Sequence, residues 1–283
     1  MNRWQIGAVR ITRIVEMEVA GGTSFILPDA TRENVRPMRW LKPHFMDGDG
    51  RLIMSIHALL LETRDRRILV DTCIGNNKPR SIPGWNMLQG SFLDDLAAAG
   101  CPPQSIDTVL CTHLHVDHVG WNTMLVEGRW VPTFMNARYL MASQEWAHWQ
   151  RKLADQRFGD AIGDSVRPVI DAGLTDLVET DHVVADEVRL EPTPGHTPGH
   201  VSVWIESGGE QAVITGDSIH HPCQMTRPDW AAATDHDPDA ARQTRLDLLR
   251  RCADAPVLVI GTHFAAPTAG QVVRDGEVFR FRV

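Results

Sequence analysis

Short apolar runs separated by turn-forming residues occupy the first part of the chain. Residues 4–20 alternate loosely between apolar and polar positions and are rich in β-branched side chains, a pattern typical of a strand with one buried face. Residues 51–63 and 67–71 are two further apolar runs joined by a short polar segment. They predict two strands connected by a tight turn, so a sheet forms early in the chain.

Three segments carry helical patterns. Ser91 can cap a helix that ends near Gly100, and residues 143–158 form a second amphipathic stretch. Asp237 followed by Pro238 predicts the start of a third helix, because proline is favoured at the first helical position. Further strands are predicted within 106–111, 183–192, 200–207, 211–217, 256–264 and, around an Asp-Gly hairpin turn, 272–281.

Strands in both halves, with helices between and after them, predict two mixed sheets stacked on each other and flanked by helices. This α/β architecture is an αββα sandwich, and we expect it to form a single domain over 1–283. Residues 20–50 differ in composition from the rest of the chain: they contain prolines, glycines and isolated aromatics but show little periodicity. A loop of this length in a compact domain is usually an arm or a lid; an ordered surface excursion without a role is the alternative.

Composition narrows the classes of function. The chain has 283 residues, 43% of them hydrophobic, and a formal net charge of −8, which opposes a surface for nucleic acid. No signal-peptide core is visible, and no run approaches the ~20 apolar residues that span a bilayer, so we expect a cytoplasmic protein without membrane contact. Five scattered cysteines without a CxxC pair predict reduced structural thiols.

The densest group of polar side chains is THLHVDHVG at 112–120. His113, His115, Asp117 and His118 follow a predicted strand and therefore lie in the loop at its end. Imidazole and carboxylate groups suit zinc, and a spacing of two in extended chain points both imidazoles to one side. Four potential ligands exceed what one tetrahedral ion takes from one loop while keeping a position for chemistry, so two ions are expected.

Three more potential ligands stand where predicted strands end: His196, Asp217 and His263. Each alone is more often an ordinary loop residue than a ligand. Together with the first cluster they make a set large enough for two ions.

With these motifs the chain resembles the metallo-β-lactamase-fold hydrolase superfamily. The HxHxDH motif, the later histidine, the aspartate and the last histidine stand in the family's order over essentially the whole chain. The resemblance implies a centre for two divalent ions, zinc above all. One metal would be held by His113, His115 and His196, the other by Asp117, His118 and His263, with Asp217 and a hydroxide bridging both. Asp71 resembles the family's early aspartate, which supports the ligand loop.

The expected reaction is hydrolysis by the bridging hydroxide, with Asp117 moving a proton toward the leaving group. No GxSxG elbow competes for this role. The segments around Asp117, Asp217 and His263 are similar to those of N-acyl-homoserine-lactone lactonases and methyl-parathion-type organophosphate hydrolases. We therefore expect a lactonase or esterase for small substrates, with a phosphotriesterase or a glyoxalase II-type thioesterase as alternatives. Because similar lactonases are dimeric, a homodimer in which 20–50 packs on the second subunit is expected.

One position departs from the lactonases, which carry a tyrosine three residues after the bridging aspartate. This chain has His220 there, and we expect it to act in catalysis by contacting the substrate oxygen. Bulky side chains near the motifs would wall an apolar pocket: Trp121, Phe264, Trp40 and Phe45. Of the other histidines, His200 and His57 are expected to have structural roles, whereas His44 and His221 are left without one.

Overall fold

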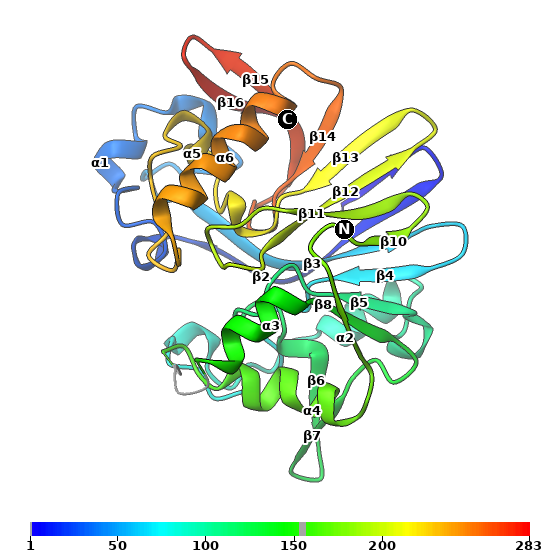
Figure 1. Ribbon diagram of the computed structural model, residues 1–283. Helices are drawn as coiled ribbons and strands as arrows, with labels where there is room; N and C mark the ends of the chain where they lie inside the picture. Colours follow the sequence, from blue (N-terminus) through cyan, green and yellow to red (C-terminus); the bar gives the residue numbers. More distant parts are fainter. Residues whose placement is uncertain (1, 153–156) are drawn as a thin grey trace.

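The computed structural model describes residues 2–152 and 157–283. Two seven-stranded sheets lie face to face at the centre, with helices on the outside of each (Figure 1). Both sheets contain parallel and antiparallel neighbours. The predicted αββα sandwich of two mixed sheets is therefore confirmed.

The first sheet has the order β1-β2-β3-β4-β5-β8-β9. Its strands are β1 (Arg3–Ile6), β2 (Val9–Ala20), β3 (Ile53–Glu62), β4 (Arg67–Val70), β5 (Thr108–Leu110), β8 (Arg138–Ala142) and β9 (Thr175–Val178). Pairing is antiparallel from β1 to β4 and parallel from β4 to β9. The helices α2 (Phe92–Ala98), α3 (Ser143–Gln150) and α4 (Arg167–Asp171) lie on its side of the molecule, as does the small hairpin of β6 (Thr123–Val126) and β7 (Arg129–Pro132) (Figure 1).

The second sheet has the order β10-β11-β12-β13-β14-β15-β16. Its strands are β10 (Val183–Ala185), β11 (Val188–Pro192), β12 (Val201–Ser207), β13 (Glu210–Ile214), β14 (Val257–Ile260), β15 (Ala269–Asp275) and β16 (Val278–Arg282). Only the β13–β14 pair is parallel. The helices α1 (Arg32–Val35), α5 (Cys223–Thr226) and α6 (Pro238–Cys252) lie on this side (Figure 1).

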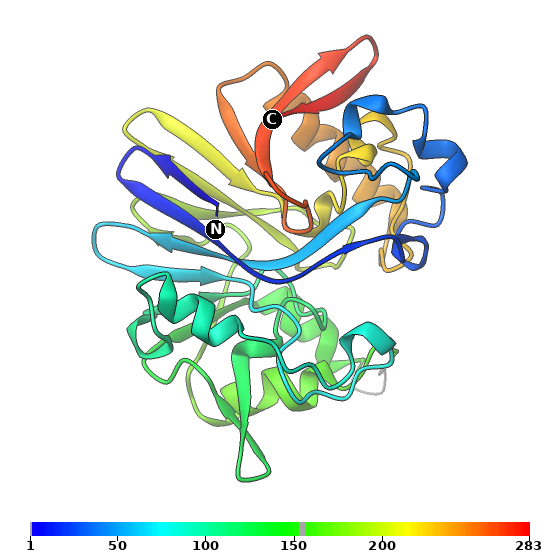
Figure 2. The ribbon, with the colours of Figure 1, turned by 180° about the vertical axis from the view of Figure 1, so that it is seen from behind.

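In strand β3, residues 58–61 are apolar without interruption. Ala58 and Leu60 pack toward the helices of the first layer, whereas Leu59 and Leu61 pack between the two sheets. A strand buried on both faces has no polar face and loses the alternation of a half-buried strand. Seen from behind, β2 and β3 curve together out of the first sheet toward residues 20–50 (Figure 2).

Two of the three predicted helices begin where expected, although the Ser91 side chain makes no capping hydrogen bond. The helix α2 follows Ser91, and α6 begins at Pro238 with the Asp237 carboxylate accepting from the backbone N of Ala240 at 3.0 Å. The third prediction, a helix over 143–158, was too long. The helix α3 ends at Gln150 and residues 151–152 form a turn, while 153–156 lie outside the described residues.

Residues 20–50 are mostly exposed but contribute several side chains to this chain's own core. Leu27, Leu41 and Phe45 are buried in one cluster with side chains of the second layer, among them Trp230 and Phe264. Residues 21–26 lie nearer the cavity described below. Removing the segment would therefore remove core packing rather than trim a surface; contact with a second subunit stays a prediction.

All five cysteines are free and buried, as expected for structural thiols. Burial raises the pKa of the Cys111 thiol to about 12, which makes it a poor nucleophile. Within the described residues, no helix combines the length and apolarity that crossing a membrane requires.

Candidate metal centre

Each sheet delivers polar side chains from the carboxyl ends of two parallel neighbours. Asp71 follows β4 and His113 follows β5, while Asp217 follows β13 and His263 follows β14. Parallel strands end at the same edge of a sheet, so each pair places its two residues side by side. The two edges face each other, and the predicted ligands meet between them.

The first ligand group joins His113, His115, His196 and Asp217. His115 Nδ1 lies 3.0 Å from His113 Nε2 and 2.9 Å from His196 Nε2. The Asp217 Oδ2 atom lies 3.3 Å from His196 Nε2 and 3.8 Å from His113 Nε2. Three imidazole nitrogens and one carboxylate oxygen thus converge on one point.

The second group joins Asp117, His118 and His263. The Nε2 atoms of His118 and His263 are 3.3 Å apart, and the Asp117 carboxylate lies 3.9 Å from the first and 3.7 Å from the second. The other Asp217 oxygen, Oδ1, faces this group at 3.4 Å from His118 and 3.1 Å from His263. Asp217 therefore lies between the two groups and presents one oxygen to each.

Hydrogen bonds on the far side of the rings assign the tautomers. His118 Nδ1 faces Asp71 Oδ2 at 2.9 Å, His196 Nδ1 faces Asp235 Oδ1 at 2.8 Å, and His263 Nδ1 faces the carbonyl oxygen of Ser55 at 3.0 Å. Each acceptor requires a proton on Nδ1, which leaves a lone pair on Nε2. Lone pairs directed at one another across 2.9–3.3 Å repel unless they share a cation. The donor set fits two divalent metal ions.

The charges of the site also favour the binding of divalent metal ions. Burial lowers the pKa of His113 and of His115 well below the ordinary value, which keeps these rings neutral as metal ligands must be. Burial would raise the pKa of Asp217, but His118 and His263 outweigh it and hold that pKa well below its usual range. Burial opposes it, but the Asp217 carboxylate in turn raises the pKa of three rings that face it, those of His118, His196 and His263. Without metal these three rings therefore hold protons beside an ionised carboxylate, and a bound cation would take the place of those protons.

Asp71 supports the ligand loop as the sequence predicts. Its backbone has φ +57°, a left-handed conformation that an aspartate tolerates better than most residues. One carboxylate oxygen accepts from the backbone N of Thr112 at 2.8 Å, and the other accepts from His118.

Two buried acids that sequence reasoning missed also position the ligands. The Asp235 carboxylate is fully buried and accepts from His196 and from the backbone N of Ala232 at 2.9 Å. Glu145 accepts from the backbone N of Leu114 and of Gly199, each at 3.1 Å. Burial raises the pKa of Glu145, although these hydrogen bonds oppose it.

Changing Asp235 to asparagine should weaken metal binding about 10- to 100-fold, the usual effect of losing a partner behind a ligating histidine. The asparagine amide has only one accepting oxygen, and its nitrogen donates. It therefore cannot accept from both His196 and the Ala232 backbone N–H. Competition with a chelator would measure the affinity. Asp229→Asn, an exposed change in the same loop, is the control, and equal affinities for both variants would contradict the positioning role.

The remaining histidines are mostly structural. His200 Nε2 accepts from the backbone N of Asp217 at 2.8 Å and so fixes that ligand's loop. His221 Nε2 lies 2.9 Å from the carbonyl oxygen of Phe45 and ties residues 20–50 to the loop after β13. His57 is buried with its Nδ1 atom 3.0 Å from Ser55 Oγ, whereas His44 is exposed.

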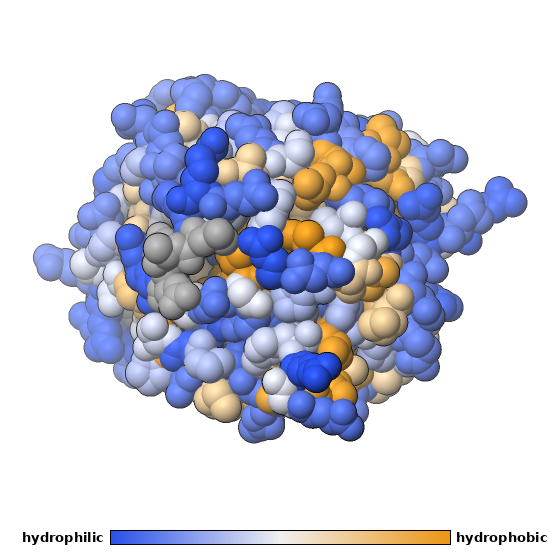
Figure 3. Space-filling model, turned by 60° about the horizontal axis from the view of Figure 1, so that its bottom comes forward, coloured by the Kyte–Doolittle hydropathy of each residue, from blue (hydrophilic) through white to orange (hydrophobic). Residues whose placement is uncertain are grey.

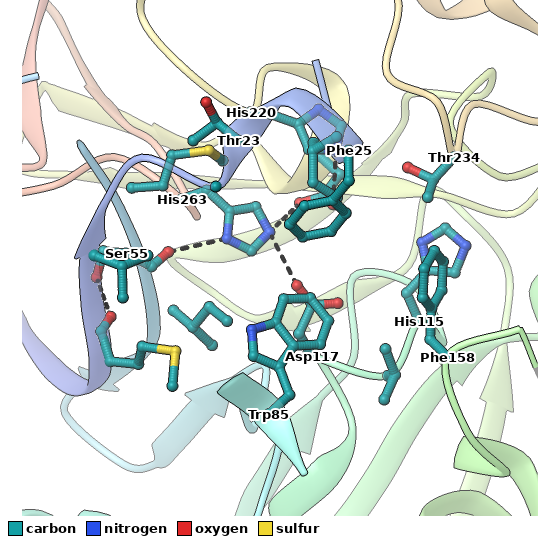
Figure 4. A pocket seen from close by; sticks show the side chains of 18 of the residues that line it. Thr23, Phe25, Ser55, Trp85, His115, Asp117, Phe158, His220, Thr234 and His263 are labelled. Atoms are coloured by element: carbon teal, nitrogen blue, oxygen red, sulfur yellow. Dashed lines mark hydrogen bonds and ion pairs between the residues drawn. The ribbon is translucent and has the colours of Figure 1, made fainter. Parts of the chain in front are cut away.

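His220 lies beside the first ligand group without joining it. Its Nε2 atom is 3.1 Å from Asp217 Oδ2, and its ring stacks on that of His263 with centroids 5.9 Å apart. The side chain is buried and faces the cavity next to the ligands (Figure 4). Among described atoms its Nδ1 has no hydrogen-bond partner.

That cavity is apolar, but its aromatic walls are not those expected from the sequence. Phe25, Trp85 and Phe158 line it, and the first two rings meet edge to face at 6.0 Å (Figure 4). The four aromatics expected there lie elsewhere: Trp121 stacks on Phe92, Phe45 and Phe264 are in the core of the second layer, and Trp40 packs against that core. Proximity in sequence to a motif did not reveal the direction of the side chain.

Comparison with known proteins agrees with this geometry. Residues 53–263 match the family model described as Metallo-beta-lactamase superfamily. An N-acyl homoserine lactonase of Bacillus sp. is 26% identical over 174 residues, which cover 56% of this chain and 61% of the lactonase. The match therefore spans less than two thirds of that relative. A "Probable metallo-hydrolase" of Mycobacterium tuberculosis is 26% identical over 255 residues, 79% of this chain and 78% of the relative.

Two solved structures share the fold. AidC, a dizinc quorum-quenching lactonase in complex with a product, superposes with a TM-score of 0.80 at 20% identity, covering 99% of this chain and 96% of the other. The hydrolase AbOPH in the beta lactamase superfamily gives a TM-score of 0.79 at 26% identity with the same coverage.

Proposed function

The chain belongs to the metallo-beta-lactamase superfamily, and we propose that it cleaves small lactones or esters with two divalent metal ions. Its relatives and structural neighbours are metal-dependent hydrolases. The observation that carries the proposal is Asp217, whose two oxygens face two separate groups of convergent ligands. An apolar cavity opens directly beside this carboxylate.

The residues divide into two sets. One ion would be held by His113, His115 and His196, the other by Asp117, His118 and His263, and Asp217 would bridge them. Two such ions would supply hydroxide near neutral pH as the nucleophile, the bridging hydroxide proposed from the sequence, and would polarise the substrate oxygen. Zinc is the proposed metal, because imidazole nitrogens dominate the donor set and a structural neighbour is named a dizinc lactonase.

Asp117 is proposed to carry the proton to the leaving group. Its side chain is 13% exposed and lines the cavity, whereas the Asp217 side chain is 5% exposed. Asp217 lines the cavity too, but Asp117 is the more accessible of the two carboxylates to solvent and a leaving group.

The cavity supports an apolar acyl or aryl group. Met17, Phe25, Ile56 and Trp85 surround it within reach of the ligands, and burial of such a group excludes water from the reacting carbonyl. Lactone cleavage is also the activity named for the Bacillus relative. A phosphotriester is the second candidate, favoured by His220 at the position where lactonases carry tyrosine. A homodimer and a cytoplasmic location remain proposals from the sequence.

Protein loaded with excess zinc and then desalted should hold about two ions per chain, because the two ligand groups are separate. The loaded protein should hydrolyse apolar lactones or aryl esters faster than phosphotriesters and thioesters in a common panel. Metal analysis and initial rates would measure both. A stoichiometry that stays at one in excess metal would contradict the two-ion site, and a preference for phosphotriesters would favour the second candidate.

A further inference from the structure

A second cavity reaches the metal centre from another side and has a different chemistry. It is lined by basic side chains of the segment after β8 and of the loop before α6, His148, Lys152, Arg157 and His236, and it extends to His115 and His196. The apolar cavity contains none of these four basic residues.

The two cavities meet at the first ligand group. His115, Val116, Phe158 and Thr234 line both, and three of them, His115, Phe158 and Thr234, stand together at one side of the apolar cavity (Figure 4). On the molecular face in Figure 3, hydrophilic side chains cover most of the surface and apolar ones are seen in a hollow near its centre. A substrate whose reacting carbonyl lies at the ligands can therefore extend one end into each cavity.

The lining of the second cavity contains more basic than acidic side chains. Asp235 is the only acid that lines it among the described residues, and its two oxygens already accept from His196 and from Ala232. Within the same part of the chain, no carboxylate forms an ion pair with the Lys152 ammonium.

His148 and His236 add hydrogen-bond donors to the basic side chains of the second cavity. Their rings meet edge to face at 4.8 Å, and the His236 backbone N donates to the carbonyl oxygen of His196 at 3.0 Å. Burial, with Lys152 next in effect, lowers the pKa of His148 to about 4. His148 is therefore a neutral donor near neutral pH, beside a cation.

We propose that the second cavity binds an anionic oxygen group, a carboxylate or a phosphate, on the alcohol side of the substrate. The substrates would be esters or lactones with an apolar acyl part and an anionic alcohol part. Hydrolysis adds the elements of water across the acyl C–O bond. An open-chain ester releases the apolar acid from one cavity and the anionic alcohol from the other, whereas a lactone gives one hydroxy acid that carries both parts. This inference rests on the proposed function, because it assigns the two ends of the same substrate.

A matched pair of esters tests the assignment. In para-(carboxymethyl)phenyl hexanoate the leaving group carries a carboxylate, and in para-(carbamoylmethyl)phenyl hexanoate it carries an amide of similar size. A methylene group separates either substituent from the ring, so the two phenols leave with similar ease. We expect kcat/KM of the zinc-loaded protein to be about 10-fold higher for the carboxylate ester, as one charge-assisted hydrogen bond in a partly exposed site allows.

Variants of Lys152 separate a specific site from general charge. Lys152→Gln should bring the ratio of the two kcat/KM values to about one by lowering the value for the carboxylate ester, and Lys152→Arg should keep most of the preference. Lys42→Gln removes the same charge from an exposed lysine of residues 20–50 and should leave the ratio unchanged. An equal rate for both esters, or a ratio unaffected by Lys152→Gln, would overturn the assignment of the second cavity.

Binding of the product distinguishes failure of this inference from failure of the proposed function. If neither ester is hydrolysed, aryl esters are not substrates, and calorimetric titration with para-hydroxyphenylacetate then tests the anion site alone. Binding that Lys152→Gln weakens about 10-fold and Lys42→Gln does not would support the site. Equal binding by both variants would refute it, because the carboxylate would then be held elsewhere, for example on the metals. Repeating the titration with inorganic phosphate shows which anion fits better.

Discussion

Replacing Asp217 with asparagine is expected to reduce bound zinc from about two ions per chain to one or fewer. The expected fall in kcat/KM is at least ~10³-fold, or about 4 kcal/mol of transition-state stabilisation. The physical reason is the position of the carboxylate, whose oxygens lie 3.1–3.4 Å from His118, His196 and His263. An amide offers one oxygen in place of two and no charge, so it cannot serve both ligand groups.

Metal analysis and steady-state kinetics measure the two effects, and circular dichroism shows whether the variant is folded. Asp229→Asn, an exposed aspartate paired with Arg227, makes the same chemical change outside the site and should keep both ions and full activity. Two tightly bound ions in Asp217→Asn would show that the carboxylate is not shared, and the two-ion proposal would then need another bridge.

The residues proposed as ligands could be identified from the sequence because each part of their signal is local. His113, His115, Asp117 and His118 are close in sequence, and Asp217 ends an apolar run that can only be a strand. Strand ends gather at sheet edges whatever the remainder of the fold does. The ligands could therefore be proposed before their distances were known.

The acids that support the ligands left no such signal. Glu145 accepts from Leu114, 31 residues away, and from Gly199, 54 residues away. In the sequence it is one more acidic residue in the first turn of a helix, where acids are common for local reasons. Its role arises only when α3 packs against two loops, and a single sequence does not contain that contact.

Aromatic residues failed as markers of the cavity for a related reason. Trp121 directly follows the metal-binding motif, yet its ring stacks on Phe92, and its Nε1 donates to Glu16 at 2.7 Å. Trp85 and Phe25 stand in segments without periodicity, and both reach the cavity. Periodicity assigns a side chain to a face of a regular element, but it gives no direction within an irregular loop.

His220→Ala is expected to keep both metals and the fold while kcat falls about 10²-fold, the effect of removing one donor to developing negative charge. Burial lowers the pKa of His220 although Asp217 opposes it, so the ring is neutral near neutral pH. A neutral imidazole has one N–H, and the hypothesis requires it on Nε2, the nitrogen that faces Asp217 and the cavity.

His220→Tyr should restore part of the activity and do so preferentially for lactones, because a phenol would then stand where similar lactonases have theirs. Metal content, kcat and KM measured separately on lactones and aryl esters distinguish the possible roles. His44→Ala, a change at an exposed histidine, is the control. Loss of metal in His220→Ala would make His220 a support for Asp217, since their contact at 3.1 Å is the closest that His220 makes to the ligands. Unchanged metal content and unchanged kcat would exclude His220 from catalysis. Catalysis would then depend on the metals and Asp117 without a donor from His220.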